Sequence, residues 1–248
     1  MNKLLKTANL PFLILGAAVL GALVRFWLYA TGLDEKGLLD SAHIGHFLIW
    51  LITLAAVAAI LLGTLRLKQA AKYSFNFPPS PISAAGAAVA AGGMLATALI
   101  QLFSGRDAMV VFTGFAGLLC TLALLFLANC RYKGLHPSML FPGVLCVYMI
   151  LHMVCLYRSW SSDPQIQDYC FALFALVSLT MACYHSAAFC ANSGNRQMHT
   201  IFHLFSIFFC IVCLPQSDMP LFYLSMSIWM FTDLCNLRPM PRTFRELR

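Results

Sequence analysis

The chain alternates between long apolar segments and short polar gaps. Eight segments predict helices, at residues 9–31, 43–65, 82–103, 107–129, 138–160, 166–190, 199–216 and 219–237. A hydrocarbon layer about 30 Å thick needs roughly 20 apolar residues per helix. Pro215 and Pro220 lie in the short turn between the last two segments. The pattern therefore predicts an all-α integral membrane protein with about eight transmembrane helices, forming a single membrane domain over residues 1–248.

The composition supports this class. Of the 248 residues, 60% are hydrophobic and 10% are charged, whereas soluble domains are about half apolar and a quarter charged. The gaps between the apolar segments are too short for a soluble domain. The bilayer is therefore the main expected partner of this chain.

The positive charges favour one side of the predicted membrane. Twelve Lys and Arg residues lie at the ends of the chain and in alternate gaps, and four lie in the other gaps, together with seven of the nine acidic residues. Positive residues prefer cytoplasmic loops. We therefore expect a multi-pass protein of the cell membrane with both termini in the cytoplasm. The charges form no continuous basic patch with interleaved aromatic residues, which argues against a nucleic-acid partner.

A weak internal similarity suggests two parallel four-helix repeats, at residues 1–134 and 135–248. Residues 25–27 read Arg-Phe-Trp and residues 158–160 read Arg-Ser-Trp, each before an acidic gap. Two four-helix halves would be related by an axis along the membrane normal. The alternative is that topology and chance alone produce this similarity.

Residues 82–93 are almost all small. Without a hydrophobic force between helices in lipid, such a helix associates by close van der Waals approach. We therefore expect it to be central or to pack against a partner helix. Ser80 and Pro81 are typical of a helix N-cap and first turn.

The ten cysteines all follow residue 119, and most lie within the predicted helices. This placement favours reduced thiols that pack as small apolar side chains. Cys210 and Cys213 form a lone C-x-x-C pair, for which packing, a disulfide or redox pair, and metal binding are the alternatives.

Ionisable residues near the predicted outer surface form the first candidate site. Ionisable groups inside a membrane are costly unless paired or solvated, so they mark functional sites. Arg25 lies well inside its helix and can bind a carboxylate or phosphate with two hydrogen bonds. One interpretation is an outward-facing pocket for a small anionic or zwitterionic solute; the other is interhelical ion pairing, with Asp40 or Asp168 as the acid. The candidate ligand-binding residues are Arg25, Arg158, His43, His46, Asp168 and His152.

A second polar cluster is expected near the cytoplasmic surface, formed by His185, His203 and Asp233. His199 lies four residues before His203 and is expected to be solvated at the start of its helix. A metal site, a proton relay, a gate and structural hydrogen bonding are the alternatives for this cluster. Haem is a further alternative, since His46 and His152 are the one pair of histidines that could ligate it across helices.

The expected function is transport. The sequence lacks the H-E-x-x-H, G-x-S-x-G, P-loop and dinucleotide-binding motifs. We therefore predict a secondary carrier, or the membrane subunit of a transport complex, with no catalytic residues, metal or cofactor assigned. A membrane-embedded redox or hydrolytic enzyme using buried His is the alternative, and a non-catalytic scaffold or sensor is a further one. A partner subunit or a homo-oligomer is compatible with each.

Overall fold

The computed structural model describes residues 9–32, 39, 43–65, 67, 70–104, 107–160 and 169–238. The helices in this part of the chain are α1 (Leu10–Thr31), α2 (Ile44–Thr64), α3 (Tyr73–Asn76), α4 (Pro81–Ser104), α5 (Ala108–Lys133), α6 (Leu140–Trp160), α7 (Cys170–Cys190), α8 (Arg196–Val212), the short 3₁₀ helix η3 (Leu214–Gln216) and α9 (Pro220–Cys235). The eight long helices match the eight apolar segments of the sequence.

Six of these helices, α1, α2, α4, α5, α6 and α7, are long and apolar enough to cross a membrane. The chain is therefore a multi-pass membrane protein. The helix α8 is apolar but has only 17 residues, and α9 has 16. At 1.5 Å per residue these two helices span about 24–26 Å, less than a typical hydrocarbon layer. The expectation of eight spans stays a prediction.

Local sequence signals define where the helices begin and end. The backbone N–H of Ser83 donates to Ser80 Oγ, which confirms the predicted N-cap of α4. The side chain of Asn195 accepts from Met198 N at the start of α8, and Asp107 accepts from Met109 N at the start of α5. Gly134 ends α5 with φ at 69°, a left-handed conformation that glycine adopts without steric cost.

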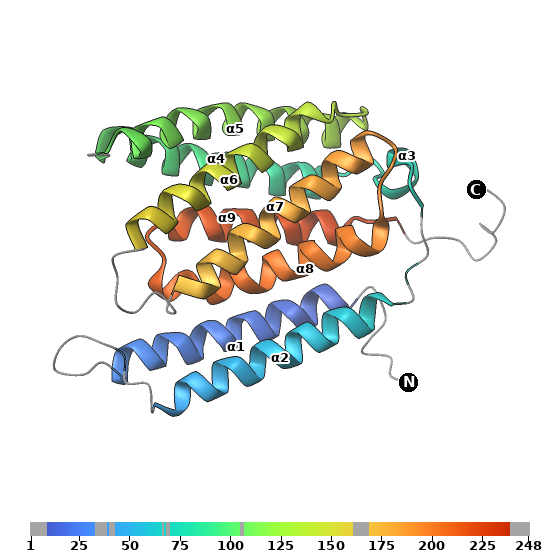
Figure 1. Ribbon diagram of the computed structural model, residues 1–248. Coiled ribbons are helices and arrows are strands. Elements are labelled where there is room, and N and C mark those ends of the chain that lie inside the picture. The colour runs from blue at the N-terminus through green and yellow to red at the C-terminus, as the bar shows by residue number, and fades with distance from the viewer. Residues whose placement is uncertain are drawn as a thin grey trace.

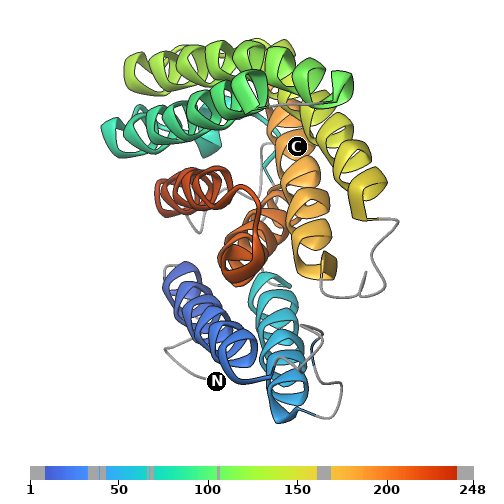
Figure 2. The ribbon, with the colours of Figure 1, turned by 90° about the vertical axis from the view of Figure 1, so that its left-hand side faces the viewer.

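Six helices form a closed ring. Within the described residues, α4 packs on α5, α5 on α6, α6 on α7, α7 on α8, α8 on α9, and α9 returns to α4. Figure 2 shows this ring nearly end-on, with the α1–α2 hairpin outside it. The hairpin packs mainly on α8. Side chains fill the ring: the rings of Tyr148 and His152 on α6 lie 6.2 and 5.7 Å from that of Phe222 on α9.

The long helices run side by side, and their connections alternate between the two ends of the bundle (Figure 1). One end carries α3, the α7–α8 turn and the end of the described chain. Hydrogen bonds join these segments, from Gly194 N to Ala71 O and from Arg238 N to Asn76 O. The other end carries η3. We refer to these as the α3 end and the η3 end.

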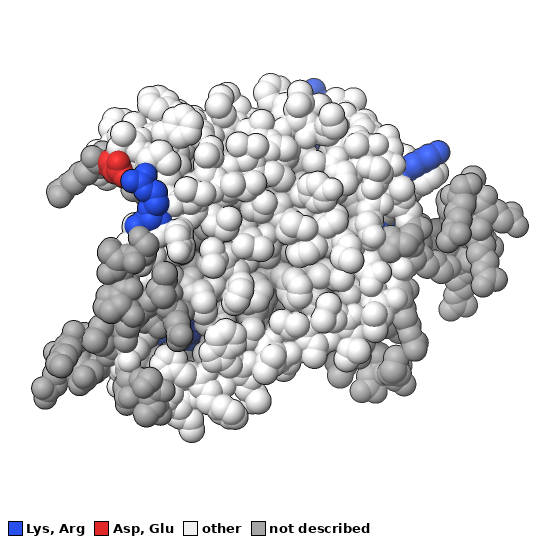
Figure 3. Space-filling model, in the orientation of Figure 1, with Lys and Arg blue, Asp and Glu red and all other residues white. Residues whose placement is uncertain are grey.

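The outside of the bundle is apolar. Large side chains such as Phe47, Leu54 and Phe103 are 67%, 67% and 86% exposed. On the face shown in Figure 3, the charged side chains lie mostly toward the two ends and leave the middle uncharged. An exposed apolar surface of this extent suits contact with lipid.

The helix α8 is the most enclosed element of the bundle. Thirteen of its 17 residues are buried, among α1, α2, α7 and α9. The two shortest long helices, α8 and α9, are neighbours in the ring, and the α1–α2 hairpin covers α8 from outside. All ten cysteines are free thiols, as expected from the sequence, and Cys210 and Cys213 are both buried.

The small residues of α4 let it approach α9 closely, as predicted. A Cβ atom placed on Gly86 would contact the side chain of Thr232, and one placed on Gly93 would contact that of Ser225. The helix α4 therefore packs against two partners, α5 on one side and α9 on another.

The two four-helix repeats stay a prediction, and the helix neighbours do not favour them. In the second half, α7 packs extensively on α8. The equivalent pair in the first half would be α2 and α4, but α2 packs mainly on α1 and α8.

Two neighbouring glycines test the contact between α4 and α9. Gly93→Ala should lower the free energy of unfolding by about 1–3 kcal/mol because the new methyl group overlaps Ser225. Gly92→Ala is the matched control, since a Cβ there has open space; it should leave stability unchanged or raise it by about 0.5–1 kcal/mol. Thermal unfolding in detergent measures both. Equal effects of the two variants would contradict the close packing.

Candidate functional site

A buried carboxylate organises the α3 end of the bundle. Asp233 on α9 is 2% exposed. Arg131 on α5 forms an ion pair with it, with Nη2 2.9 Å from Oδ1 and 3.0 Å from Oδ2. Ser83 on α4 donates its hydroxyl to Oδ1 at 2.8 Å. Three helices of the ring thus meet at one carboxylate, whose charge is compensated.

Two histidines of α8 face the same carboxylate. The Nε2 atoms of His199 and His203 lie 4.0 and 3.8 Å from Asp233 Oδ2. Both side chains are fully buried, and their rings stack with centroids 3.7 Å apart. The expectation that His199 is solvated is wrong, because Phe77 and Phe189 cover its ring.

The predicted cluster of His185, His203 and Asp233 is only partly brought together. His185 on α7 is half-buried and stacks on Phe202, with ring centroids 5.3 Å apart. In the structure His199, rather than the predicted His185, lies beside His203 and Asp233. We call the group His199, His203, Asp233, Arg131 and Ser83 the α3-end cluster.

Arg131 and Arg196, two of the positive charges in the gaps between the predicted helices, are held by protein groups. The guanidinium of Arg131 lies 3.9 Å from the ring centroid of Phe77 and 5.2 Å from that of Tyr73. Arg196 is 7% exposed and donates to Arg238 O and to Asn76 Oδ1. Burial raises the pKa of the Tyr73 phenol above its ordinary value.

A small cavity adjoins the α3-end cluster. Its volume is about 20 Å³, enough for about one water molecule. Side chains of α3, α5, α6, α7 and α9 line it, among them Tyr73, Arg131, Ser186, Cys190, Trp229 and Asp233. A solvent molecule there would contact both the ion pair and the Ser186 hydroxyl.

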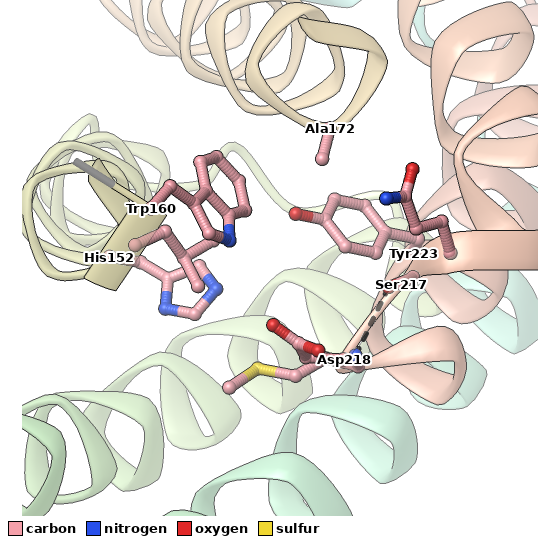
Figure 4. Close-up of a pocket in the computed structure, with 9 residues that line it drawn as sticks. His152, Trp160, Ala172, Ser217, Asp218 and Tyr223 are labelled. Carbon is pink, nitrogen blue, oxygen red and sulfur yellow. Dashed lines mark hydrogen bonds between the residues drawn. The ribbon is translucent and has the colours of Figure 1, made fainter. Parts of the chain in front are cut away.

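A second small cavity lies inside the ring at the η3 end. It measures about 10 Å³ and is lined by α6, α7, α9 and the turn before α9. Figure 4 shows His152, Trp160, Asp218 and Tyr223 pointing toward one another across it. Both ring nitrogens of His152, Trp160 Nε1 and the Tyr223 hydroxyl are buried and have no hydrogen-bond partner among the described residues.

These unpartnered groups are the most unusual polar feature of the structure. Buried polar groups nearly always have hydrogen-bond partners, and an unpaired one costs about 1–3 kcal/mol. His152 is 1% exposed and its ring stacks parallel to that of Tyr148, 5.6 Å away. A single water molecule in this cavity would satisfy several of these groups at once.

Arg25 faces a third, larger cavity outside the ring. This cavity has a volume of about 340 Å³ and lies between α1, α2 and α7, lined by Arg25, Leu28, Tyr29, His46, Ile49, Trp50, Cys170 and Phe171. The guanidinium donates to Val212 O at 3.2 Å and to Gln216 Oε1 at 2.7 Å, and it lies over the ring of Phe171. Arg25 is therefore both a bridge to the α8–α9 turn and a wall of a cavity.

Gln216 connects the Arg25 cavity to the η3-end cavity. Its Oε1 accepts from Arg25 and from the Tyr29 hydroxyl, while its side chain also lines the cavity of His152 and Tyr223. Hydrogen bonds from Arg25 and Tyr29 to Gln216 thus link the linings of the two cavities. Sequence alone missed this residue because a glutamine in a turn carries no distinguishing signal.

The predicted outer site is divided between these spaces. Arg25 and His46 line the 340 Å³ cavity, and His152 lines the η3-end cavity. His43 instead caps α2, accepting from Gly45 N, and packs on Trp27. Arg158 is exposed at the end of α6. Asp40 and Asp168 lie outside the described residues. His46 and His152, the pair considered for haem, line different cavities.

Comparison with known proteins finds no matching protein family, no similar characterised protein and no similar solved structure. The geometry of the three cavities and of the α3-end cluster therefore supplies the argument about function.

Proposed function

We propose that the chain is a small-solute membrane transport component, acting as a secondary carrier or as the membrane subunit of a transport complex. One observation carries the proposal. Two polar cavities lie at opposite ends of the six-helix ring, and the same three helices, α6, α7 and α9, line both. A path through the ring would join them.

An apolar barrier separates the two cavities. On α9 the cavity residues Tyr223 and Trp229 are six positions apart, which corresponds to about 9 Å of helix. Among the side chains between the cavities, five are fully buried and apolar, namely Leu145 and Met149 of α6, Leu176 and Leu179 of α7, and Met226 of α9. The barrier closes the path between the two small cavities in this structure, so a solute larger than water would enter only when the helices move apart.

The side chains at the η3 end favour a small anionic or zwitterionic solute. Trp160 and Tyr223 offer N–H and O–H donors, and Arg25 supplies a positive charge beyond Gln216. The carboxylate of Asp218 also points into the cavity (Figure 4), so an ammonium group would find an acidic partner there. These groups complement the two ends of a zwitterion.

The orientation belongs to the same proposal. The excess of Lys and Arg at the α3 end supports an orientation with that end in the cytoplasm and the η3 end outside the cell. Cysteines introduced one at a time in place of Lys72 and Ser159, in a background without the ten native cysteines, test this in intact cells. A membrane-impermeant maleimide should label position 159 and spare position 72. Labelling at position 72 and not at position 159 would show the opposite orientation.

Ligand binding and uptake test the transport proposal. The purified full-length protein is screened by thermal shift against glycine, L-alanine, L-glutamate and succinate, and a stabilising compound is then used in radiolabelled form with proteoliposomes. A ligand at 100 times its Kd should stabilise the folded state by about 2.7 kcal/mol. Uptake should be saturable. Tyr223→Phe, which loses one donor at constant shape, should weaken affinity about tenfold, as expected for the loss of about 1.4 kcal/mol.

Tyr157→Phe is the matched control, because Tyr157 lies on α6 but is 58% exposed. It should leave affinity and uptake unchanged. If the two variants behave alike, the η3-end cavity is not the binding site. If no compound stabilises the protein and none is taken up, the enzyme and scaffold alternatives replace transport.

A further inference from the structure

Three potential metal ligands meet in the α3-end cluster. The Nε2 atoms of His199 and His203 and a carboxylate oxygen of Asp233 all lie within 4.8 Å of one another, and all three residues are buried. The two histidines are four positions apart on α8 and therefore share a helix face. Asp233 faces them from α9.

The hydrogen bonding of His203 fixes its tautomer. Its Nδ1 lies 2.8 Å from the backbone carbonyl oxygen of His199, which can only accept a hydrogen bond. Nδ1 therefore carries the proton, and Nε2 of the neutral ring presents a lone pair. This lone pair faces Asp233 Oδ2 at 3.8 Å, and no residue in the described part of the chain donates to it.

A buried lone pair facing a carboxylate oxygen is unfavourable unless a cation lies between them. A proton on Nε2 would draw the two atoms to about 2.7–3.2 Å, the range of a hydrogen bond. A single proton could also bond to only one of the two imidazole nitrogens. Both His199 and His203, however, face the same carboxylate oxygen, at 4.0 and 3.8 Å. A tetrahedral ion with bonds of about 2.0–2.1 Å holds its ligands about 3.4 Å apart.

We propose that His199, His203 and Asp233 bind a divalent transition-metal ion, with Zn²⁺ as the best match. Two imidazoles and one carboxylate are ligands typical of zinc and related ions. The Nδ1–H of His203 bonded to a backbone carbonyl is the supporting contact that orients a metal-binding histidine. The site lies at the edge of the ring, and its test does not involve the transport proposal.

The surroundings fit an ion with an open position. The Ser186 hydroxyl donates to Ala182 O at 2.9 Å, so its Oγ, 3.4 Å from His199 Nε2, accepts the proton of that nitrogen, and a metal ion would displace this proton to Nδ1. The adjoining 20 Å³ cavity has room for one metal-bound water. Arg131 opposes the ion, because its positive charge contacts both oxygens of Asp233. We therefore expect tighter binding as pH rises, since a metal-bound water then loses a proton and offsets this charge.

Metal binding to the untagged full-length protein tests the site. The protein is purified in detergent, treated with a chelator and equilibrated with Zn²⁺ or Co²⁺. Elemental analysis should find one ion per chain, and Co²⁺ should give the visible absorption of a four-coordinate site. His203→Asn should weaken binding at least tenfold. The Asn amide can still donate to His199 O as Nδ1 does, so we expect the fold to be preserved. The Nε2 ligand is lost.

His185→Asn is the control, because this nearby histidine is outside the cluster; it should bind Zn²⁺ as the wild type does. Circular dichroism and gel filtration verify that each variant is folded. The proposal would be overturned if the wild type held less than one ion per chain, or if His203→Asn bound Zn²⁺ as tightly as the wild type. A proton would then be the cation between the histidines and Asp233. If His203→Asn does not fold, the Co²⁺ spectrum of the wild type decides, and absence of four-coordinate absorption overturns the site.

Discussion

The structure depends on one buried charge. Asp233 lies on the interior side of α9, where an uncompensated carboxylate would cost several kcal/mol. Arg131 compensates it from α5, and Ser83 adds a hydrogen bond from α4. The carboxylate thereby ties three helices of the ring together at the α3 end and places the two histidines of α8 at a fixed distance.

The burial of two short helices follows from the same constraint. The polar residues of α8 and α9 could not face hydrocarbon, and within the bundle they find partners: Arg131 of α5 for Asp233, and Asn76 of α3 for Arg196. The longer helices carry the lipid-facing apolar surface. Polar chemistry is thus concentrated in the ring and beside it, where the three cavities lie, and an apolar barrier keeps its two ends apart.

Much of the fold could be predicted from the sequence, because hydropathy and helix caps are local signals. Every long helix lies within a few residues of its predicted segment, and the N-cap at Ser80 is as expected. The site was harder to predict because its contacts are long-range. Arg131 and Asp233 are 102 positions apart, and no local sequence pattern pairs them.

The burial of His199 shows the same limit. A histidine near a helix start is usually solvated, and only the folded chain brings Phe77 of the α3 segment and Phe189 of α7 over its ring. Likewise, Gln216 joins Arg25 to the η3-end cavity through a contact 191 positions apart in the chain. Helix packing, rather than any motif, creates both arrangements.

A double-mutant cycle on Arg131 and Asp233 tests the central claim most directly. Unfolding free energies are measured in mixed micelles, in the presence of a chelator, for Arg131→Gln, Asp233→Asn and the double variant. Each single change should cost about 3–5 kcal/mol, because it strands a buried charge. The double variant should lose much less than the sum. Single effects that add within about 0.5 kcal/mol would contradict the account, since they would show that the two side chains are energetically independent.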